Sequence, residues 1–211
     1  LAGVLLGVEY LVGDAALAHH PAQQLGLLDA DRADQHRLAL GVAFLDVVDD
    51  RPELPWEDLR DGFVAHGWHD LNHRKTVLDV AGVGIEFRGT DDAHLGRDDY
   101  LRVAGTVSAE ADLGIGLTHA PYARVVDPMI DDGCALVFAG HTHGGQVCVP
   151  GYGALVSNCD LAPGRASGLS VHPGNARRGY LHVSAGLGTS PLAPFRFACR
   201  PSATLVTLTP A

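Results

Sequence analysis

The chain has 211 residues and a formal net charge of -10, with 46% hydrophobic and 19% charged residues. This length suits one domain with a sizeable core, and this balance argues against wholesale disorder. Because binding to nucleic acid relies on clustered Lys and Arg, we expect no nucleic acid among its partners.

Residues 1–52 show only loose helical patterns. The opening LAGVLLGVEYLV is apolar, but it contains Glu9 and is shorter than the ~20 residues of a membrane-spanning helix. We therefore interpret it as part of a soluble core and expect no transmembrane segment in this chain. Residues 1–52 are an unassigned segment, which is divergent, replaces a truncated upstream half or comes from a misread frame. A start at Leu1 rather than Met is compatible with the last two.

The next segments have clearer patterns. PELPWEDLRDGFVAHG, residues 52–67, predicts a short amphipathic helix, because Pro55 suits a first turn and Gly67 suits a stop. KTVLDVAGVGIEFRG, residues 75–89, predicts two strands joined by a tight turn.

Two apolar runs then flank a helical pattern. DLGIGLTHAP, residues 112–121, predicts a strand that ends before His119, because Pro121 cannot continue the ladder. YARVVDPMIDDG, residues 122–133, predicts a helix that Pro128 either kinks or starts, and CALVFAG, residues 134–140, predicts a second buried strand. This βαβ pattern indicates an α/β fold with the two strands parallel.

Three later segments, residues 145–158, 179–190 and 195–210, contain short strand-like runs between glycines and prolines. We expect them to form a second layer that is rich in antiparallel strands. The four cysteines include no C-x-x-C pair, and we expect them to be reduced and mostly buried.

Three histidines follow the two parallel strands. His141 and His143 stand either side of Thr142 in LVFAGHTHGGQ, and His119 follows the neighbouring strand. Ligands of open α/β sheets bind outside the carboxyl ends of strands, and neutral imidazole favours Zn, Mn, Fe, Co or Ni over Mg. The pattern therefore points to a transition-metal site, although an isolated H-x-H pair is more often a hydrogen-bonded loop feature.

The chain also resembles a known family. THAP at 118–121 and GHTHGGQ at 140–146 resemble the last two signature blocks of the calcineurin-like metallophosphoesterases, and the resemblance is closest to the bacterial YkuE-like branch. It covers residues 53–211, which would form the C-terminal part of such a domain, and includes LPWEDLR, GTDDAHLGRDDY, YGALVSNCDL and VSAGLGTSPLAPFRFACRP.

The resemblance implies a four-layer α/β sandwich, incomplete at its N-terminal side, and a hydrolase of phosphomonoesters, phosphodiesters or pyrophosphates. It implies two divalent transition-metal ions, Mn, Zn, Fe or Ni, with His119 and His141 on one ion and His143 on the other. Gly140, Gly144 and Gly145 would shape the turn that carries the ligands.

The upstream family blocks D-x-H, G-D and N-H are not found in convincing form. Gly13-Asp14 and Asn72-His73 match only fragments of them. Without the carboxylate that bridges the two ions, mutual repulsion of the cations would weaken a dinuclear site. We assign no catalytic residue, and a catalytically inactive or single-metal binding protein stays open as an alternative, as does a structural zinc module.

Substrate contacts are predicted from two further segments. Asp92 and His94 in GTDDAHLGRDD would either line the substrate entrance or belong to a solvated loop, and SAGLGTS, residues 184–190, would present backbone N–H groups to phosphate. The resemblance implies a phosphorylated small molecule or a lipid-linked substrate. We expect a cytoplasmic protein, or a membrane-peripheral one if an upstream segment is missing.

Overall fold

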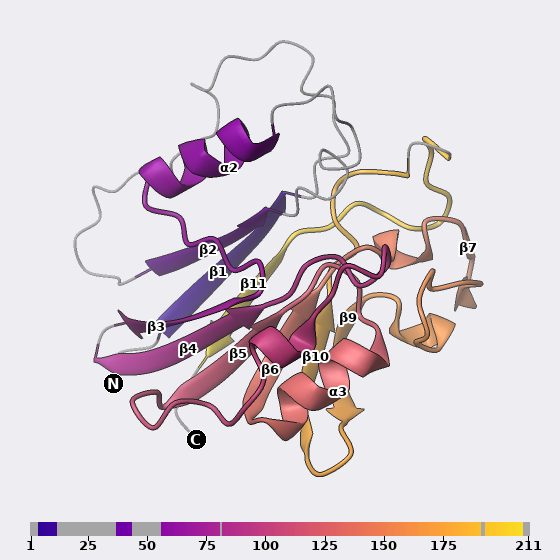
Figure 1. Ribbon diagram of the computed structural model, residues 1–211. Helices are drawn as coiled ribbons and strands as arrows, with labels where there is room; N and C mark the ends of the chain where they lie inside the picture. Colours follow the sequence, from indigo (N-terminus) through magenta and orange to yellow (C-terminus); the bar gives the residue numbers. More distant parts are fainter. Residues whose placement is uncertain (1–3, 12–36, 44–55, 81, 191–192, 209–211) are drawn as a thin grey trace.

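The computed structural model describes residues 4–11, 37–43, 56–80, 82–190 and 193–208 (Figure 1). In chain order the described strands and α-helices are β1 (Val4–Leu11), β2 (Arg37–Ala43), α2 (Trp56–Ala65), β3 (Arg74–Val80), β4 (Val83–Gly89), β5 (Leu113–Leu117), α3 (Ala123–Asp131), β6 (Cys134–Ala139), β7 (Cys148–Val149), β8 (Gly153–Ala154), β9 (Gly168–Pro173), β10 (Arg178–Val183) and β11 (Thr204–Leu208).

A six-stranded mixed sheet forms the centre of the described structure, with strand order β3-β4-β5-β6-β10-β9. The four inner strands β4, β5, β6 and β10 are parallel, and the two edge strands are antiparallel to their neighbours. The fold is therefore α/β. All four parallel strands end at one edge of the sheet, which is where ligands of such sheets bind.

Helix α3 packs on one face of this sheet, as Figure 1 shows. Its apolar stripe of Val125, Val126, Met129 and Ile130 is buried, which is the spacing expected of a core-facing helix. The helix approaches β5 closely at Gly116, where an added Cβ would lie 2.7 Å from the Met129 sulfur. The crossover between β5 and β6 is thus held tightly against the strands that it connects.

The other face of the sheet carries a second apolar cluster that includes Ile85, Phe87, Ile115 and Phe138. Val206 and Leu208 of β11 pack against this cluster. Strand β11 belongs to a smaller sheet of order β11-β1-β2, in which it pairs antiparallel with β1. Strands from opposite ends of the chain therefore share one sheet (Figure 1).

Most of the predicted elements are confirmed. The helix at 52–67 corresponds to α2, the hairpin to β3 and β4, and the βαβ unit to β5, α3 and β6, with β5 and β6 parallel. Pro128 lies inside α3. All four cysteines are free thiols, and Cys134 and Cys148 are buried.

Two expectations are wrong. Residues 4–11 and 37–43 are strands rather than loosely helical segments, because each pairs with a partner that is distant along the chain. Strand β10 does not belong to a second layer but joins the central sheet beside β6. The rest of residues 1–52 lies outside the described residues, so the division into 1–52 and 53–211 stays a prediction.

None of the helices in the described ranges is both long and apolar enough to cross a bilayer.

Candidate metal centre

The candidate site lies at the carboxyl edge of the four parallel strands. Each strand is followed directly by polar residues: Asp92 and His94 come after β4, His119 after β5, His141 and His143 after β6, and the Ser184–Gly188 turn after β10. Backbone hydrogen bonds join these segments, from Gly140 N to His119 O at 2.8 Å and from Ser184 N to Ala139 O at 2.8 Å. The sheet thus brings every predicted site residue to one edge.

His119 and His141 contact each other directly. The distance between His119 Nε2 and His141 Nδ1 is 2.9 Å, and the rings meet edge to face with centroids 4.8 Å apart. His119 is buried with 5% exposure. Two nitrogens bound to one ion at ~2.1 Å would lie ~3.4 Å apart at the tetrahedral angle and ~3.0 Å apart at the right angle of an octahedral ion, so the observed separation is closer to octahedral coordination.

His141 is held in its neutral form. Burial, followed by the proximity of His119 and His94, lowers the pKa of His141 to about 3. Its Nε2 lies 3.2 Å from the backbone O of Asn158 and 3.0 Å from Asn158 Nδ2. With Nδ1 as the ligand atom, the neutral ring carries its proton on Nε2, which donates to Asn158 O and orients the ring. Neutral imidazole is the form that binds metal, and an oriented ring loses little freedom on binding.

The described residues supply only part of a ligand set. Within the described ranges, no group of three or more His, Cys, Asp or Glu side chains is arranged to hold an ion. His143 lines the same surface hollow as His141. The observed fit is therefore a pair of imidazole donors, with His143 beside them.

The segment after β6 has an unusual backbone. His141, His143, Gly144, Gly145 and Gln146 all have φ between 51° and 84°, a region that residues other than Gly adopt uncommonly, although Asn, Asp and His are enriched there. Thr142 supports the turn, since its hydroxyl donates to Ala166 O at 2.6 Å and accepts from Gly144 N. Such strain persists only where the surroundings fix it, and it is common at binding sites.

Asp92 and His94 are brought to the same site from β4. The His94 ring lies against that of His141, with centroids 4.2 Å apart, and His94 Nδ1 contacts the Tyr122 hydroxyl at 3.0 Å. Asp92 is 2% exposed, and its carboxylate accepts from the His94 backbone N–H at 2.6 Å. Asp92 therefore shapes the loop, while the His94 ring covers the histidine pair.

The turn after β10 completes the hollow, which is lined by His141, His143, Ser184, Gly186, Gly188 and Arg196 among others. Ser184 is 3% exposed, and its hydroxyl accepts from Gly186 N at 3.1 Å. This hydroxyl orders the turn.

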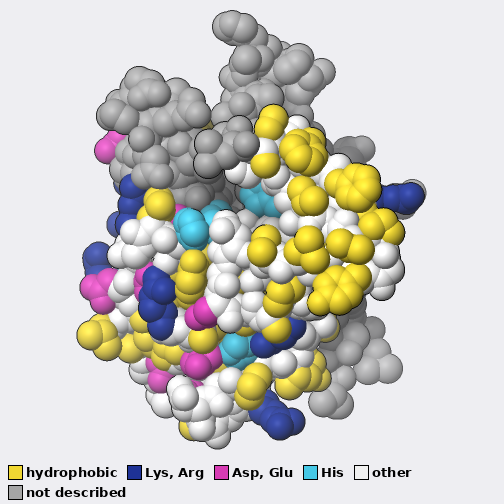
Figure 2. All heavy atoms as spheres, turned by 90° about the vertical axis from the view of Figure 1, so that its right-hand side faces the viewer, with side chains coloured by type: hydrophobic (Ala, Val, Ile, Leu, Met, Phe, Trp, Pro, Cys, Tyr) yellow, Lys and Arg dark blue, Asp and Glu magenta, His cyan; other side chains and the backbone are white. Residues whose placement is uncertain are grey.

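Exposed apolar side chains gather beside the histidines, as Figure 2 shows. They come from residues 147–156 and 187–197, two segments joined by backbone hydrogen bonds between Cys148 and Phe197 and between Phe197 and Gln146. Neither 146–159 nor 184–195 contains an Asp, Glu, Lys or Arg. The members of this apolar surface are Val147, Val149, Tyr152, Leu155, Val156, Leu187, Phe195 and Phe197.

Three residues of the site were not singled out in the sequence. Asn158, Tyr122 and Arg196 reach it from segments that include YGALVSNCDL and FRFACRP, but their types and spacing carry no signal of their own. Asn72 and His73 bind Asp91 and the Asp99 N–H instead, in a loop beside the sheet. Gly13 and Asp14 lie outside the described residues.

The chain is similar to two curated proteins of Bacillus subtilis (strain 168). It is 33% identical over 141 residues to YkuE, which is described as an uncharacterized metallophosphoesterase. The aligned region covers 65% of this chain and 45% of YkuE. It is also 27% identical over 148 residues to the uncharacterized protein YpbG, and this aligned region covers 69% of this chain and 50% of YpbG. The similarity to YkuE supports the metallophosphoesterase superfamily.

The chain spans about half the length of these curated relatives. No protein-family model matches it. No solved structure matches it.

Proposed function

We propose that the chain is part of a metal-dependent phosphoesterase that hydrolyses a phosphomonoester, phosphodiester or pyrophosphate. The observation that carries this proposal is the contact of His119 Nε2 with His141 Nδ1 at 2.9 Å, at the carboxyl edge of the parallel strands. The similarity to a named metallophosphoesterase supports the same reading. The complete protein would have the four-layer α/β sandwich of that superfamily, and the packing of β11 against the central sheet is consistent with this.

In this proposal His119 and His141 bind one divalent ion and His143 binds a second. A bound transition metal, Mn, Zn, Fe or Ni, would supply activation of water and stabilisation of phosphoryl charge. The low pKa of His141, about 3, keeps its ring available as a neutral donor at physiological pH.

Other residues would position the substrate. The His94 ring, oriented by the Tyr122 hydroxyl, lies over His141 and can contact a substrate that approaches the histidine pair. Asp92 would act through the His94 backbone and thereby keep the loop in place. The Ser184–Gly188 turn lies beside His143, where its backbone can face phosphoryl oxygens.

A second candidate function is a catalytically inactive or single-metal binding protein. It is favoured by the lack, within the described ranges, of a third His, Cys, Asp or Glu side chain that converges with the histidine pair. Two imidazoles without a carboxylate leave the charge of a second cation unscreened. The two functions differ in turnover, not in binding of the first ion.

A metal titration combined with a phosphodiesterase assay distinguishes the two. Mn²⁺ is titrated into the chain by calorimetry, and hydrolysis of bis(p-nitrophenyl) phosphate is followed with and without Mn²⁺. We expect binding and turnover in the wild type and loss of both in His141→Ala. His69→Ala serves as the control, because His69 is exposed and lies on the loop that follows α2.

Each outcome selects one reading. Mn²⁺ binding that depends on His141 without turnover would identify the single-metal or inactive protein. Turnover that survives in His141→Ala would show that hydrolysis does not require the histidine pair. Absence of Mn²⁺ binding in the wild type would reject both proposals for this chain.

The substrate that we propose is a phosphorylated small molecule or a lipid-linked phosphate. The apolar surface formed by Val147, Val149, Tyr152, Leu155, Val156, Leu187, Phe195 and Phe197 adjoins the histidines and supports the lipid-linked form (Figure 2). Burial of a hydrocarbon chain there would contribute ~25 cal/mol per Å² of apolar area removed from water.

A further inference from the structure

Arg196 is the cationic residue among the described side chains that line the hollow beside His141 and His143. It forms no ion pair with any acidic residue in the part of the chain that the structure describes. Its hydrogen-bond partners are instead the sulfur of Cys199 and backbone carbonyls in two segments that follow different strands of the central sheet. This combination is unusual, because a partly buried guanidinium is normally paired with a carboxylate.

The contacts of Arg196 connect both walls of the hollow. Its Nη1 donates to His143 O at 2.9 Å, its Nη2 donates to Ala185 O at 2.6 Å and Gly186 O at 3.3 Å, and its Nε donates to Gly188 O at 2.9 Å. One side chain thus holds the residue proposed as a metal ligand and three residues of the turn after β10.

Two cysteines also bind the carbonyl groups of His143 and Gly144. Cys199 Sγ donates to His143 O at 3.2 Å and to Gly144 O at 3.4 Å, and Cys148 Sγ donates to Gly144 O at 3.4 Å. Arg196 Nη1 also lies 3.6 Å from Cys199 Sγ. The carbonyl groups of His143 and Gly144 therefore accept from Arg196 and Cys199 of the C-terminal segment as well as from Cys148 and the Gln146 N–H.

We infer that Arg196 is a positioning residue, which fixes His143 and the Ser184–Gly188 turn in the arrangement that the metal centre requires. The inference deepens the proposed function and rests on it for the metal, but the positioning itself can be measured without metal. A guanidinium is needed because its donors form a planar fork that reaches several carbonyls at once, whereas the ammonium group of Lys is a single point with rotatable donors.

The arrangement has an electrostatic consequence. Because the hydrogen-bond partners of Arg196 are carbonyls and a thiol rather than carboxylates, its positive charge contributes a positive potential to the hollow. Such a potential favours an anionic group such as a phosphoryl oxygen at this edge of the sheet.

The test compares Arg196→Lys and Arg196→Gln with the wild type. Arg200→Gln is the matched control, since Arg200 is an exposed arginine in the same segment. Amide hydrogen exchange is measured on metal-free protein at residues 143–146 and 185–188, and Mn²⁺ affinity is measured by calorimetry. We expect both Arg196 variants to exchange at least tenfold faster at these residues and to bind Mn²⁺ about 10 to 100 times more weakly, with melting temperatures above the assay temperature and no change in Arg200→Gln.

Failure of the inference is distinguishable from failure of the proposed function. Exchange and Mn²⁺ affinity in Arg196→Lys equal to those of the wild type would overturn the positioning role. A wild type that binds no Mn²⁺ would reject the metal proposal, while the exchange data would still decide whether Arg196 fixes the turn. If neither variant folds, phenylglyoxal modification of the native wild type decides: we expect Arg196 to react more slowly than Arg200, and equal rates would overturn the inference.

Discussion

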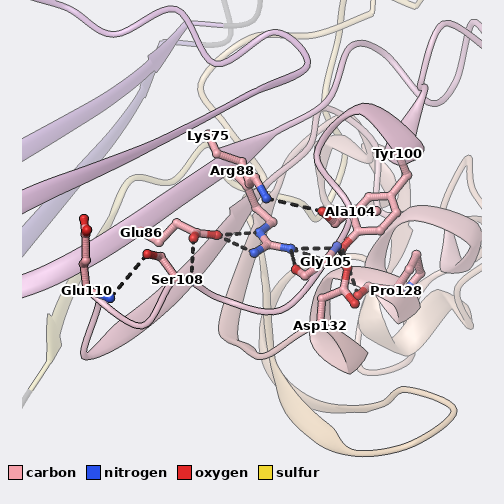
Figure 3. A network of polar contacts seen from close by, with 10 residues as sticks. All are labelled: Lys75, Glu86, Arg88, Tyr100, Ala104, Gly105, Ser108, Glu110, Pro128 and Asp132. Atoms are coloured by element: carbon pink, nitrogen blue, oxygen red, sulfur yellow. Dashed lines mark hydrogen bonds and ion pairs between the residues drawn. The ribbon is translucent and has the colours of Figure 1, made fainter.

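Two polar regions of this molecule differ in how their charges are balanced. Around Arg88, shown in Figure 3, the fully buried guanidinium is paired with Glu86 and donates to Gly105 O at 2.8 Å, while Tyr100 donates to Asp132 at 2.5 Å. Around His141, imidazoles contact one another, and the nearby Arg196 contacts carbonyls.

Whether the charges of a polar cluster are paired within the fold separates a structural cluster from a candidate binding site. In the Arg88 network the guanidinium is paired with the carboxylates of Glu86 and Asp132, and the network ties the loop that carries Tyr100 and Gly105 to the sheet. In the histidine site the ring nitrogens of His119 and His141 contact each other, and Arg196 adds a positive charge whose partners include backbone carbonyls. The first region is complete by itself, whereas the second is the one that we propose to bind an ion and an anion.

The largest effect is expected at Arg88. Arg88→Met leaves the Glu86 carboxylate, which is 3% exposed, without its ion-pair partner, and should lower the free energy of unfolding by about 3–5 kcal/mol. Urea denaturation measures this change. Arg74→Ala is the control, because Arg74 is 65% exposed and pairs with Asp70 at the surface, and it should cost no more than about 1 kcal/mol. Equal effects at the two arginines would break the comparison.

A smaller loss is expected within the turn of the histidine site. Gly145 has φ 84°, and an added Cβ would lie 2.4 Å from Ala154 Cβ, whereas Gly151 has φ 78° with nothing within 4 Å. Both Ala variants are strained, but Gly145→Ala also forces a clash and should destabilise by about 1–3 kcal/mol more than Gly151→Ala. Thermal denaturation of the two variants measures the difference in their stability. Equal stability would mean that the turn moves aside to accommodate the added Cβ at little cost.

Acid sensitivity offers a third distinction. Burial lowers the pKa of His182, which lies beside Phe138 in the core. As pH falls below ~6.5, the unfolded chain gains a proton at this position and the folded chain does not. The contribution of His182 to the free energy of unfolding is therefore complete above this pH. Below it, that contribution is lost by up to about 1.4 kcal/mol per pH unit. His182→Gln should therefore show a flatter dependence of unfolding free energy on pH between 6.5 and 5. An unchanged slope would assign the acid sensitivity to other groups.

The smallest change in stability is expected at the apolar surface. Phe195→Ser removes a ring that is 58% exposed and should alter the free energy of unfolding by no more than about 0.5 kcal/mol. If the surface holds a hydrocarbon chain, the same variant should weaken binding of a long-chain alkyl phosphate and leave binding of a short-chain one unchanged. Calorimetric titration with both esters measures this, and equal weakening for the two would count against the lipid-linked substrate.

The sequence by itself determined the local elements and part of the site. Helical spacing with Gly67 as a stop predicted α2, and short apolar runs that end before His119 and His141 predicted β5 and β6. Periodicity and turn residues are local signals, and they act through a few neighbouring positions of the chain. The placement of histidines after two strands joined by a helix was sufficient to predict their proximity.

Only the tertiary structure decided which distant segments complete that site. The pairing of β10 with β6 brought the Ser184–Gly188 turn to the histidines, and the fold of the C-terminal segment brought Arg196 to the carbonyl of His143. The partners of Arg88 and the contact of His94 with His141 were decided in the same way. Strand order and side-chain partners depend on packing between residues far apart in the chain, because burial and hydrogen bonding are satisfied by spatial neighbours, which the local pattern of residues does not specify.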